Sequence, residues 1–363
     1  MKNSLLKESI HHTALDGLFR YADFLNFGEV CVKFDHDTGL KAIIAIHNLK
    51  RGPAIGGCRL VSYPSTDHAL EDSLRLAYMM SFKAAISNLP HGGAKAVLIK
   101  PNVIKNRRAY LEAFGRFVEE LGGKYITAMD SGTSVEDMDI IETQTQYVTC
   151  TTSSGNGGDP SPYTALGVRR GIEAAVKFKL GKDTLEGVHV AIQGAGHVGY
   201  FLAKELKKRG AQLTMCDVNQ DNLRRCVEEL GVATCAVEAI YDIKADIFAP
   251  CALGAVLNLH TIKRLQVSIV AGSANNQLAH HQHGGLMQEK GILYAPDFVI
   301  NAGGLIYVAE TYNNKNTHHA ISQVENIYST LTAIFESAAQ QECATNQIAE
   351  TIAWERLNTP SIE

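Results

Sequence analysis

The chain has 363 residues, of which 45% are hydrophobic and 20% charged, and its formal net charge is −4. This length predicts about two domains with ample core, and the mildly acidic balance without a basic block argues against a nucleic-acid partner. No apolar run reaches the roughly 18 residues of a membrane span. Residues 1–12 lack a secretory signal, and the eight cysteines include no C-x-x-C pair, so we expect reduced thiols in a cytoplasmic protein.

The first 150 residues alternate between strand and helix signals. Strands are expected over residues 41–47, 96–99 and 125–128, and helices over 67–85 and 108–121. Two glycine-bearing segments, residues 52–59 and 90–95, are predicted as turns because glycine favours turns. Residues 153–162 are polar and rich in Gly and Pro, as expected of a hinge or domain boundary, and a helix is predicted over 164–178.

The most informative stretch is an apolar strand, 190–193, followed by a G-x-G-x-x-G turn and an amphipathic helix. In this pattern Gly194 allows a tight turn, Gly196 lets the backbone approach a pyrophosphate, and Gly199 allows close packing of helix and strand. The free N–H groups at the start of the helix attract phosphate. The whole turn is Gly194, Ala195, Gly196, His197, Val198 and Gly199. It predicts dinucleotide binding; the alternative is a glycine-rich turn without a ligand.

Asp217 closes the next apolar run, residues 212–216. A carboxylate there can accept hydrogen bonds from the adenosine ribose and would repel a 2′-phosphate, so NAD is favoured over NADP. Further strands are expected over 247–250, 268–271 and 292–294, with Gly/Asn-rich turns at 272–276 and 301–304. Ligands bind at the carboxyl ends of strands in open α/β sheets, so these turns are expected to line a cofactor site. Residues from about 318 onward are predicted to be helical.

Three residues of the first half combine reactive groups with unusual settings. Lys83 lies in an apolar helical stretch, Lys95 stands between glycines and an apolar strand, and Asp130 closes a strand. Each lysine could be a functional amine, or it could merely extend its aliphatic stem along apolar surface to bring its charge to solvent. Asp130 could merely cap the turn that follows. The residues alone leave these alternatives open.

The ordered segments of the chain resemble the glutamate/leucine/phenylalanine/valine group of amino-acid dehydrogenases, over roughly residues 39–308. The matching segments are T-G-L-K-A-I-I-A-I-H, G-P-A-x-G-G, H-G-G-A-K, D-x-G-T, S-P-Y-T-A-L-G-V, P-C-A-L-G-A, G-S-A-N-N-Q-L and V-I-N-A-G-G.

The resemblance assigns a role to each candidate. It implies that Lys83 holds the substrate α-carboxylate, that Lys95 activates water against the imino intermediate, and that Asp130 exchanges a proton with the amino group. Burial lowers the pKa of an amine, as a general base requires. Asn301 would orient substrate and nicotinamide, and Gly56-Gly57 would form a wall beside the substrate.

The resemblance extends to the cofactor and the fold. Thr164 and Asn275 match contacts to the nicotinamide half of the cofactor. The implied α/β fold has two domains separated by a cleft: a substrate, catalytic and oligomerisation domain over 1–155 and a Rossmann-type NAD-binding domain over 156–330. A helical segment over 331–363 is expected to pack back toward the first domain. The resemblance also implies a homo-oligomer, an octamer, and closure of the cleft about the 153–162 hinge.

Two residues bear on the substrate. Glutamate-specific relatives carry a lysine where this chain has Ile55, and an apolar residue would leave the second carboxylate of glutamate unpaired. Phenylalanine- and tryptophan-using relatives tend to have glycine where this chain has Ala128, whose methyl group narrows the pocket. Branched-chain L-amino acids are therefore expected, converted with NAD and water into 2-oxo acids, ammonia and NADH.

Three alternatives remain. One is a dehydrogenase of the same fold that prefers valine or phenylalanine. Another is a catalytically silent NAD-binding regulator, which loss of Lys95 or Asp130 would have suggested. The third is metal binding by the histidines of residues 280–283; we expect no metal site there, because the run is predicted as a polar loop without paired ligand spacing.

Overall fold

The structure is a computed structural model that describes residue 25 and residues 27–152, 158–252, 254–313 and 316–359. The described residues form two compact units. The first contains those up to Asp159 together with those from Trp354 onward, and the second runs from Pro160 to Ala353. Residues 1–12, and residues 153–157 of the predicted 153–162 hinge, lie outside the described ranges.

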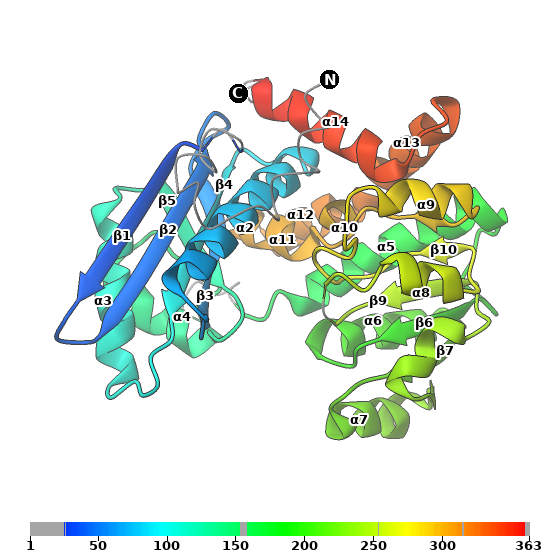
Figure 1. Cartoon of the computed structure of the whole chain (residues 1–363), viewed down its shortest axis with the longest axis horizontal. Coiled ribbons are helices and arrows are strands. Elements are labelled where there is room, and N and C mark those ends of the chain that lie inside the picture. The colour runs from blue at the N-terminus through cyan, green and yellow to red at the C-terminus, as the bar shows by residue number, and fades with distance from the viewer. Residues whose placement is uncertain (1–24, 26, 153–157, 253, 314–315, 360–363) are drawn as a thin grey trace. The chain divides into compact units, whose positions relative to one another are not determined.

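The first unit is built on a five-stranded sheet with the order β1-β2-β4-β3-β5. Its strands are β1 (Glu29–Asp35), β2 (Leu40–Asn48), β3 (Ala54–Val61), β4 (Gly92–Ile99) and β5 (Tyr125–Met129). Its helices are α2 (Thr66–Ile86), α3 (Arg107–Glu120) and α4 (Val135–Glu142). β1, β2 and β4 pair antiparallel, whereas β3 pairs parallel with β4 and β5. Helix α2 packs against β4 and β2 (Figure 1).

Strand register sets which residues share the α2 face of this sheet. Ile55 pairs with Gly93 of β4 and with Ile126 of β5, and Gly57 pairs with Ala128. Residues that pair across two adjacent strands point to the same face of the sheet, and so do alternate residues along one strand. Ile55, Gly57, Arg59, Gly93, Lys95, Ile126 and Ala128 therefore lie on one face. A methyl group at Gly93 would stand 2.0 Å from the backbone nitrogen of Ser81 in α2, which identifies the face as the one that α2 covers.

The predicted turns over residues 52–59 and 90–95 are wrong for most of their length, because β3 and β4 occupy them. The glycines are needed here for close backbone approach. A methyl group at Gly56 would lie 1.7 Å from the carbonyl oxygen of Ala94, and one at Gly92 would lie 1.7 Å from that of Asn48. Only Gly52, with a φ of +127°, has the conformation that favours glycine in a turn.

The second unit is built on a six-stranded parallel sheet with the order β11-β10-β9-β6-β7-β8. Its strands are β6 (His189–Gln193), β7 (Gln212–Cys216), β8 (Ala233–Thr234), β9 (Ile247–Pro250), β10 (Ile269–Val270) and β11 (Leu293–Tyr294). Its first helical elements are α5 (Ser161–Leu180), α6 (His197–Lys207), α7 (Gln220–Leu230), the 3₁₀ turn η2 (Val237–Asp242), α8 (Leu259–Arg264) and α9 (His283–Glu289). The later helices are α10 (Asp297–Ile300), α11 (Gly303–Tyr312), α12 (Thr317–Glu325), α13 (Ile327–Gln340) and α14 (Thr345–Asn358).

In chain order this sheet has the 3-2-1-4-5-6 arrangement of a Rossmann fold, with its switch point between β6 and β9. The predicted strands over 190–193, 212–216 and 247–250 and the predicted helix over 164–178 are confirmed. Residues from Thr317 onward are mostly helical, as predicted. The turn predicted at 301–304 is partly wrong, because Gly303 already begins α11.

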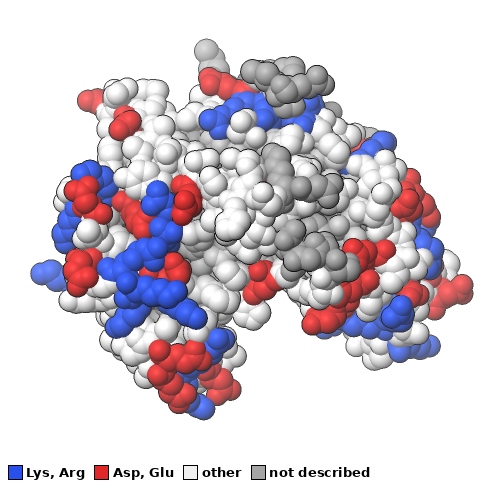
Figure 2. All heavy atoms as spheres, turned by 180° about the vertical axis from the view of Figure 1, so that it is seen from behind, with Lys and Arg blue, Asp and Glu red and all other residues white. Residues whose placement is uncertain are grey.

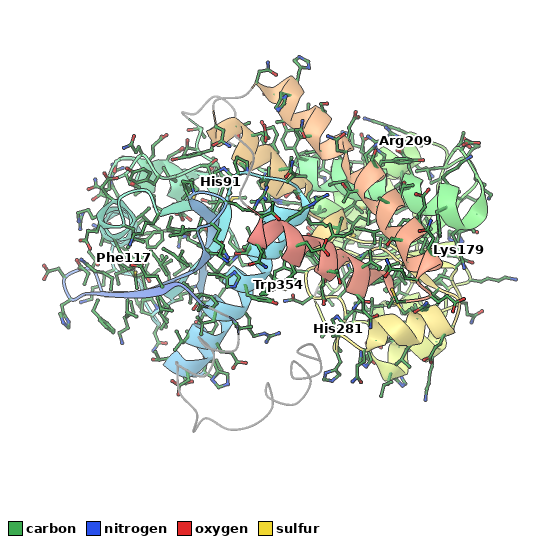
Figure 3. All side chains as sticks on the ribbon, turned by 90° about the horizontal axis from the view of Figure 1, so that it is seen from above. His91, Phe117, Lys179, Arg209, His281 and Trp354 are labelled. Carbon is green, nitrogen blue, oxygen red and sulfur yellow. The ribbon has the colours of Figure 1, made fainter. Side chains whose placement is uncertain are left out.

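The last helix contributes to both units, since the boundary between them falls at Ala353 within α14. In the first unit the ring of Trp354 lies 6.1 Å from that of Phe82 on α2; Figure 3 labels Trp354 on this helix. The Arg51 guanidinium donates to the carbonyl oxygens of Leu89 and Arg356 at 3.2 and 3.0 Å. These contacts fasten the end of α14 to α2 and to the segment after it.

Acidic and basic side chains are intermixed on the face that Figure 2 shows. All eight cysteines are free thiols. Within the described ranges, helices long and apolar enough to span a membrane are absent.

Candidate active site

The first unit contains an ion pair between the buried Lys95 and the half-buried Asp130. The Nζ atom of Lys95, on β4, lies 2.5 Å from Oδ2 of Asp130, which follows β5. The Lys95 side chain is 8% exposed and that of Asp130 22%. Two residues singled out separately in the sequence are thus in direct contact beneath α2. Such a pair can hold and transfer a proton at one place.

The D-x-G-T segment fixes the backbone of Asp130. The Thr133 hydroxyl accepts a hydrogen bond from the Asp130 amide at 3.0 Å and lies 2.9 and 3.0 Å from the carbonyl oxygens of Asp130 and Cys58. Gly132 has a φ of +84°, and a methyl group there would lie 2.0 Å from the Leu60 carbonyl oxygen. The threonine and the glycine together hold the loop against β3.

The two substrate-selecting candidates lie on the same sheet face as Lys95. Ile55 is 0% exposed and Ala128 is 9% exposed. Between them Gly57 makes room for the catalytic candidate, because a methyl group there would stand 2.7 Å from Cβ of Asp130. Gly56 points instead at the backbone of β4. Strands β3 and β5 therefore each contribute a buried apolar side chain to the sheet face that carries Lys95.

Sequence reasoning missed a second cation at this site. Nε of Arg59 lies 3.1 Å from Oδ2 of Asp130, and its Nη1 lies 2.8 Å from Oδ2 of Asp72 on α2. Arg59 is four residues after Ile55, so alternation along β3 would have placed it on the same face had residues 54–61 been recognised as a strand. Its partner on α2 is set by tertiary packing, for which the sequence carries no local signal.

These cations set the ionisation of Asp130. Burial alone would raise the pKa of its carboxyl group, but the ion pairs with Lys95 and Arg59 lower the pKa to about 2. The backbone N–H of Ser131 contributes in the same direction. Asp130 is therefore a carboxylate at neutral pH.

In the second unit the G-x-G-x-x-G turn has the features of a phosphate cradle. Gly194 has a φ of +108°, and a methyl group at Gly199 would lie 2.1 Å from the Gly194 carbonyl oxygen. Gly196 is different, because a methyl group there would meet no atom within 4 Å. Gly194 and Gly199 therefore allow the backbone to form a tight turn, and Gly196 leaves open space at the start of α6. The turn fits a dinucleotide, whose pyrophosphate needs this approach.

Asp217 lies beside that turn, at the end of β7. Its Oδ2 accepts a hydrogen bond from the Ala195 amide at 2.5 Å, and its Oδ1 accepts one from Asn219 at 2.7 Å. The carboxylate is therefore fixed against the glycine turn, where an adenosine ribose would lie in a Rossmann fold. His197 and Val198 begin α6, and His197 is exposed.

Three further candidates of the second unit lie near one another. Asn301, 5% exposed, donates from Nδ2 to Oδ1 of Asn275 at 2.8 Å and to the Ser273 carbonyl oxygen at 3.1 Å. A methyl group at Gly304 would stand 2.5 Å from the hydroxyl of Thr164 on α5. This places the two asparagines and the threonine around the start of α11. They form a neutral polar cluster.

The remaining predictions have mixed outcomes. Lys83 lies in the last turn of α2, half-buried, two residues beyond Ser81. The polar-loop prediction for residues 280–283 is wrong at its end, because His283 begins α9, is buried and hydrogen-bonds the Leu257 carbonyl oxygen. His281 pairs with Glu350 at 2.8 Å. Across the described part of the chain, clusters of three His, Cys, Asp or Glu residues able to hold a metal are absent.

Comparison with known proteins agrees with this geometry. Residues 26–147 match the family model described as the Glu/Leu/Phe/Val dehydrogenase dimerisation domain, and residues 216–357 match that of glutamate/leucine/phenylalanine/valine dehydrogenase. The leucine dehydrogenase of Thermoactinomyces intermedius is 47% identical over 94% of this chain and 93% of its own. The L-tryptophan dehydrogenase of Nostoc punctiforme is 44% identical over 91% of this chain and 94% of its own.

A solved structure agrees as well. The crystal structure of L-tryptophan dehydrogenase from Nostoc punctiforme superposes with a TM-score of 0.80 at 42% identity, covering 94% of this chain and 98% of that one. The matches cover both units, so the chain belongs to the glutamate/leucine/phenylalanine/valine dehydrogenase family of NAD(P)-dependent oxidoreductases and is an amino-acid dehydrogenase.

Proposed function

We propose that the enzyme catalyses the NAD-dependent, reversible oxidative deamination of L-leucine and other branched-chain L-amino acids. The amino acid, NAD and water yield the 2-oxo acid, ammonia, NADH and a proton. The observation that carries the proposal is the Lys95–Asp130 ion pair, with Lys95 on the same sheet face as the buried, apolar Ile55 and Ala128. A proton-transfer pair beside an apolar surface suits an amino acid with a hydrocarbon side chain.

Each charged residue has a separate task in this proposal. Lys83 binds the substrate α-carboxylate. Asp130, ionised at neutral pH, accepts a proton from the substrate amino group. Lys95 then activates the water that attacks the imino carbon. Because Lys95 and Asp130 are in direct contact, a proton released by one of them can be held by the other.

The second unit binds the cofactor in this proposal. The turn from Gly194 to Gly199 holds the pyrophosphate, and Asp217 accepts hydrogen bonds from the adenosine ribose hydroxyls. NAD rather than NADP is proposed because a 2′-phosphate would meet this carboxylate. Thr164, Asn275 and Asn301 orient the nicotinamide half. When bound, NAD supplies the hydride acceptor.

The substrate preference comes from two apolar contacts. Ile55 leaves the side-chain carboxylate of glutamate without a partner, and the methyl of Ala128 narrows the space for an aromatic ring. The similar identities to a leucine and a tryptophan dehydrogenase, 47% and 44%, favour a second candidate, a dehydrogenase of the same mechanism that prefers a larger or smaller apolar amino acid. We also propose assembly into a homo-octamer through the first unit, which matches the dimerisation-domain model.

The test is a substrate panel. The purified protein is mixed with NAD and leucine, isoleucine, valine, phenylalanine or glutamate at alkaline pH, and NADH absorbance is followed. Fast reduction with the branched-chain acids and none with glutamate is expected. A preference for phenylalanine would leave the Lys95 and Asp130 roles standing and overturn those of Ile55 and Ala128. Silence with every substrate, in protein that still binds NADH, would overturn the proposed function.

A further inference from the structure

The Asp130 carboxylate is held from two sides through a single oxygen atom. Lys95 reaches Oδ2 from β4 at 2.5 Å, and Arg59 reaches the same Oδ2 from β3 at 3.1 Å. Charge-assisted hydrogen bonds of this kind fix a carboxylate in orientation as well as in charge. Oδ2 is the oxygen that both cations contact, and the backbone N–H of Ser131 also hydrogen-bonds the carboxyl group.

Arg59 is itself clamped between the sheet and α2. Its Nη1 lies 2.8 Å from Oδ2 of Asp72, and the Tyr63 hydroxyl donates to the same oxygen at 2.6 Å. The planar guanidinium thus bridges two carboxylates with different nitrogens. A lysine ammonium at this position could not span both with a fixed geometry. The arrangement links the helix to the reacting carboxylate through one side chain.

The charges around Asp130 nearly balance. Two cations face two carboxylates, and each carboxylate contacts Arg59. Removal of Arg59 would leave Asp72 without its cation and Asp130 with only Lys95. The other titratable side chains around this cluster are Tyr63, which hydrogen-bonds Asp72, and the buried Cys58 and Tyr125. Burial raises the pKa of both Cys58 and Tyr125, and the charge of Asp130 acts in the same direction.

We infer that Arg59, anchored by Asp72, is a positioning residue for the deamination: it holds Oδ2 of Asp130 against Lys95, so that Oδ1 is the oxygen presented to the substrate amino group. This inference rests on the proposed function, since it requires Asp130 to act on the substrate. Arg59 does more than neutralise Asp130, because Lys95 already supplies a positive charge beside that carboxylate.

The experiment compares Arg59→Gln, Arg59→Lys and Asp72→Asn with wild type in the full enzyme. For Arg59→Gln we expect kcat to fall about 10- to 100-fold while KM for leucine changes little, as is usual when a supporting residue is lost. Loss of the cation favours the protonated carboxyl group, so the acid limb of the kcat/KM profile moves to higher pH. Arg59→Lys recovers part of the loss because it keeps the charge.

Asp72→Asn tests the anchor. It should lower kcat less than Arg59→Gln does, and adding it to Arg59→Gln should cause no further loss, because it acts only through Arg59. The matched control is Arg75→Gln on the exposed side of α2, which should behave as wild type. Circular dichroism and NADH affinity report whether each variant is folded.

The outcomes separate this inference from the proposed function. Wild-type kcat and an unmoved acid limb in folded Arg59→Gln would overturn the role of Arg59. If Arg59→Gln does not fold, Arg59→Lys and Asp72→Asn decide: wild-type kcat in both would also overturn it. Additive losses in the double variant would overturn the anchoring by Asp72. Wild-type turnover in Asp130→Asn would overturn the role of Asp130 on which this inference rests. Silence of the wild-type enzyme with every amino acid, in protein that still binds NADH, would instead overturn the proposed function.

Discussion

The two units hold their candidate residues in opposite ways. In the first, Lys95, Asp130, Arg59 and Asp72 form a line of ion pairs under α2. In the second, the polar cluster is neutral: the buried Asn301 donates to the exposed Asn275 and to a backbone carbonyl. An amide can donate and accept hydrogen bonds without titrating, whereas an ion pair can gain or lose a proton. The difference suits the proposed division of tasks, with proton transfer in the first unit and recognition of the dinucleotide in the second.

The sharpest test of this division is Lys95→Ala. Loss of a proton-transfer group lowers turnover by about 10²- to 10⁴-fold, but NADH affinity should be unchanged because the dinucleotide turn belongs to the second unit. Steady-state rates and a fluorescence titration with NADH measure the two effects separately. Lys41→Ala, on the exposed side of β2, is the matched control. Wild-type rates in Lys95→Ala would contradict the mechanism.

A smaller loss is expected for Ile55→Lys. Ile55 is completely buried, and an ammonium group in its place would lie next to the leucine side chain without a partner. We expect kcat/KM for leucine to fall at least about 100-fold, which corresponds to roughly 3 kcal/mol. Ile55→Val, which removes one methylene, should retain most activity. Unchanged leucine turnover in folded Ile55→Lys would show that the residue is not in the pocket.

Two glycine substitutions compare the units directly. Gly196→Ala should weaken NADH binding about tenfold with an unchanged melting temperature, because the added methyl group enters open space needed by a phosphate. Gly56→Ala should lower the melting temperature, because its methyl group would clash with the Ala94 carbonyl oxygen. Calorimetry and NADH titration distinguish the cases. A stability loss in Gly196→Ala with normal affinity would reverse the assignment.

The smallest effect is expected for Ala128→Gly. Removal of one methyl group changes discrimination by about 1–3 kcal/mol at most. The ratio of phenylalanine to leucine turnover should therefore rise several-fold, with little change in NADH affinity. The ratio of kcat/KM values with the two amino acids measures it. An unaltered ratio would count against a pocket lined by Ala128.

Local patterns predicted elements of both units where the sequence displays a periodicity of a few residues. The strand–turn–helix around Gly194 and the run that ends at Asp217 are examples in the second unit, as are the helices over 67–85 and 108–121 in the first. The glycine pairs of β3 and β4 instead resemble turns, because their reason is a neighbouring backbone that is distant in sequence. The strands β3 and β4 were therefore mistaken for turns, because their glycines are there to let neighbouring strands approach closely.

The same limit applies to the candidate site. The family motifs pointed to Lys95 and Asp130 individually, and the structure places them in contact. Arg59 and Asp72 were not selected, because an arginine in a presumed turn and an aspartate on a helix surface carry no local sign that they meet. The contact between Arg59 and Asp72 depends on how α2 packs across the sheet, and this packing is set by the folded unit as a whole.

The shared helix α14 has a consequence for synthesis. Most of the first unit precedes the second along the chain, but two of its contacts need residues that follow the second unit. Trp354 lies against Phe82, and the Arg356 carbonyl accepts the hydrogen bond from Arg51. During translation the second unit can be completed before the unit that precedes it, because domains fold as their residues emerge. A chain ending at Ala353 would thus lose part of the first unit rather than a free tail.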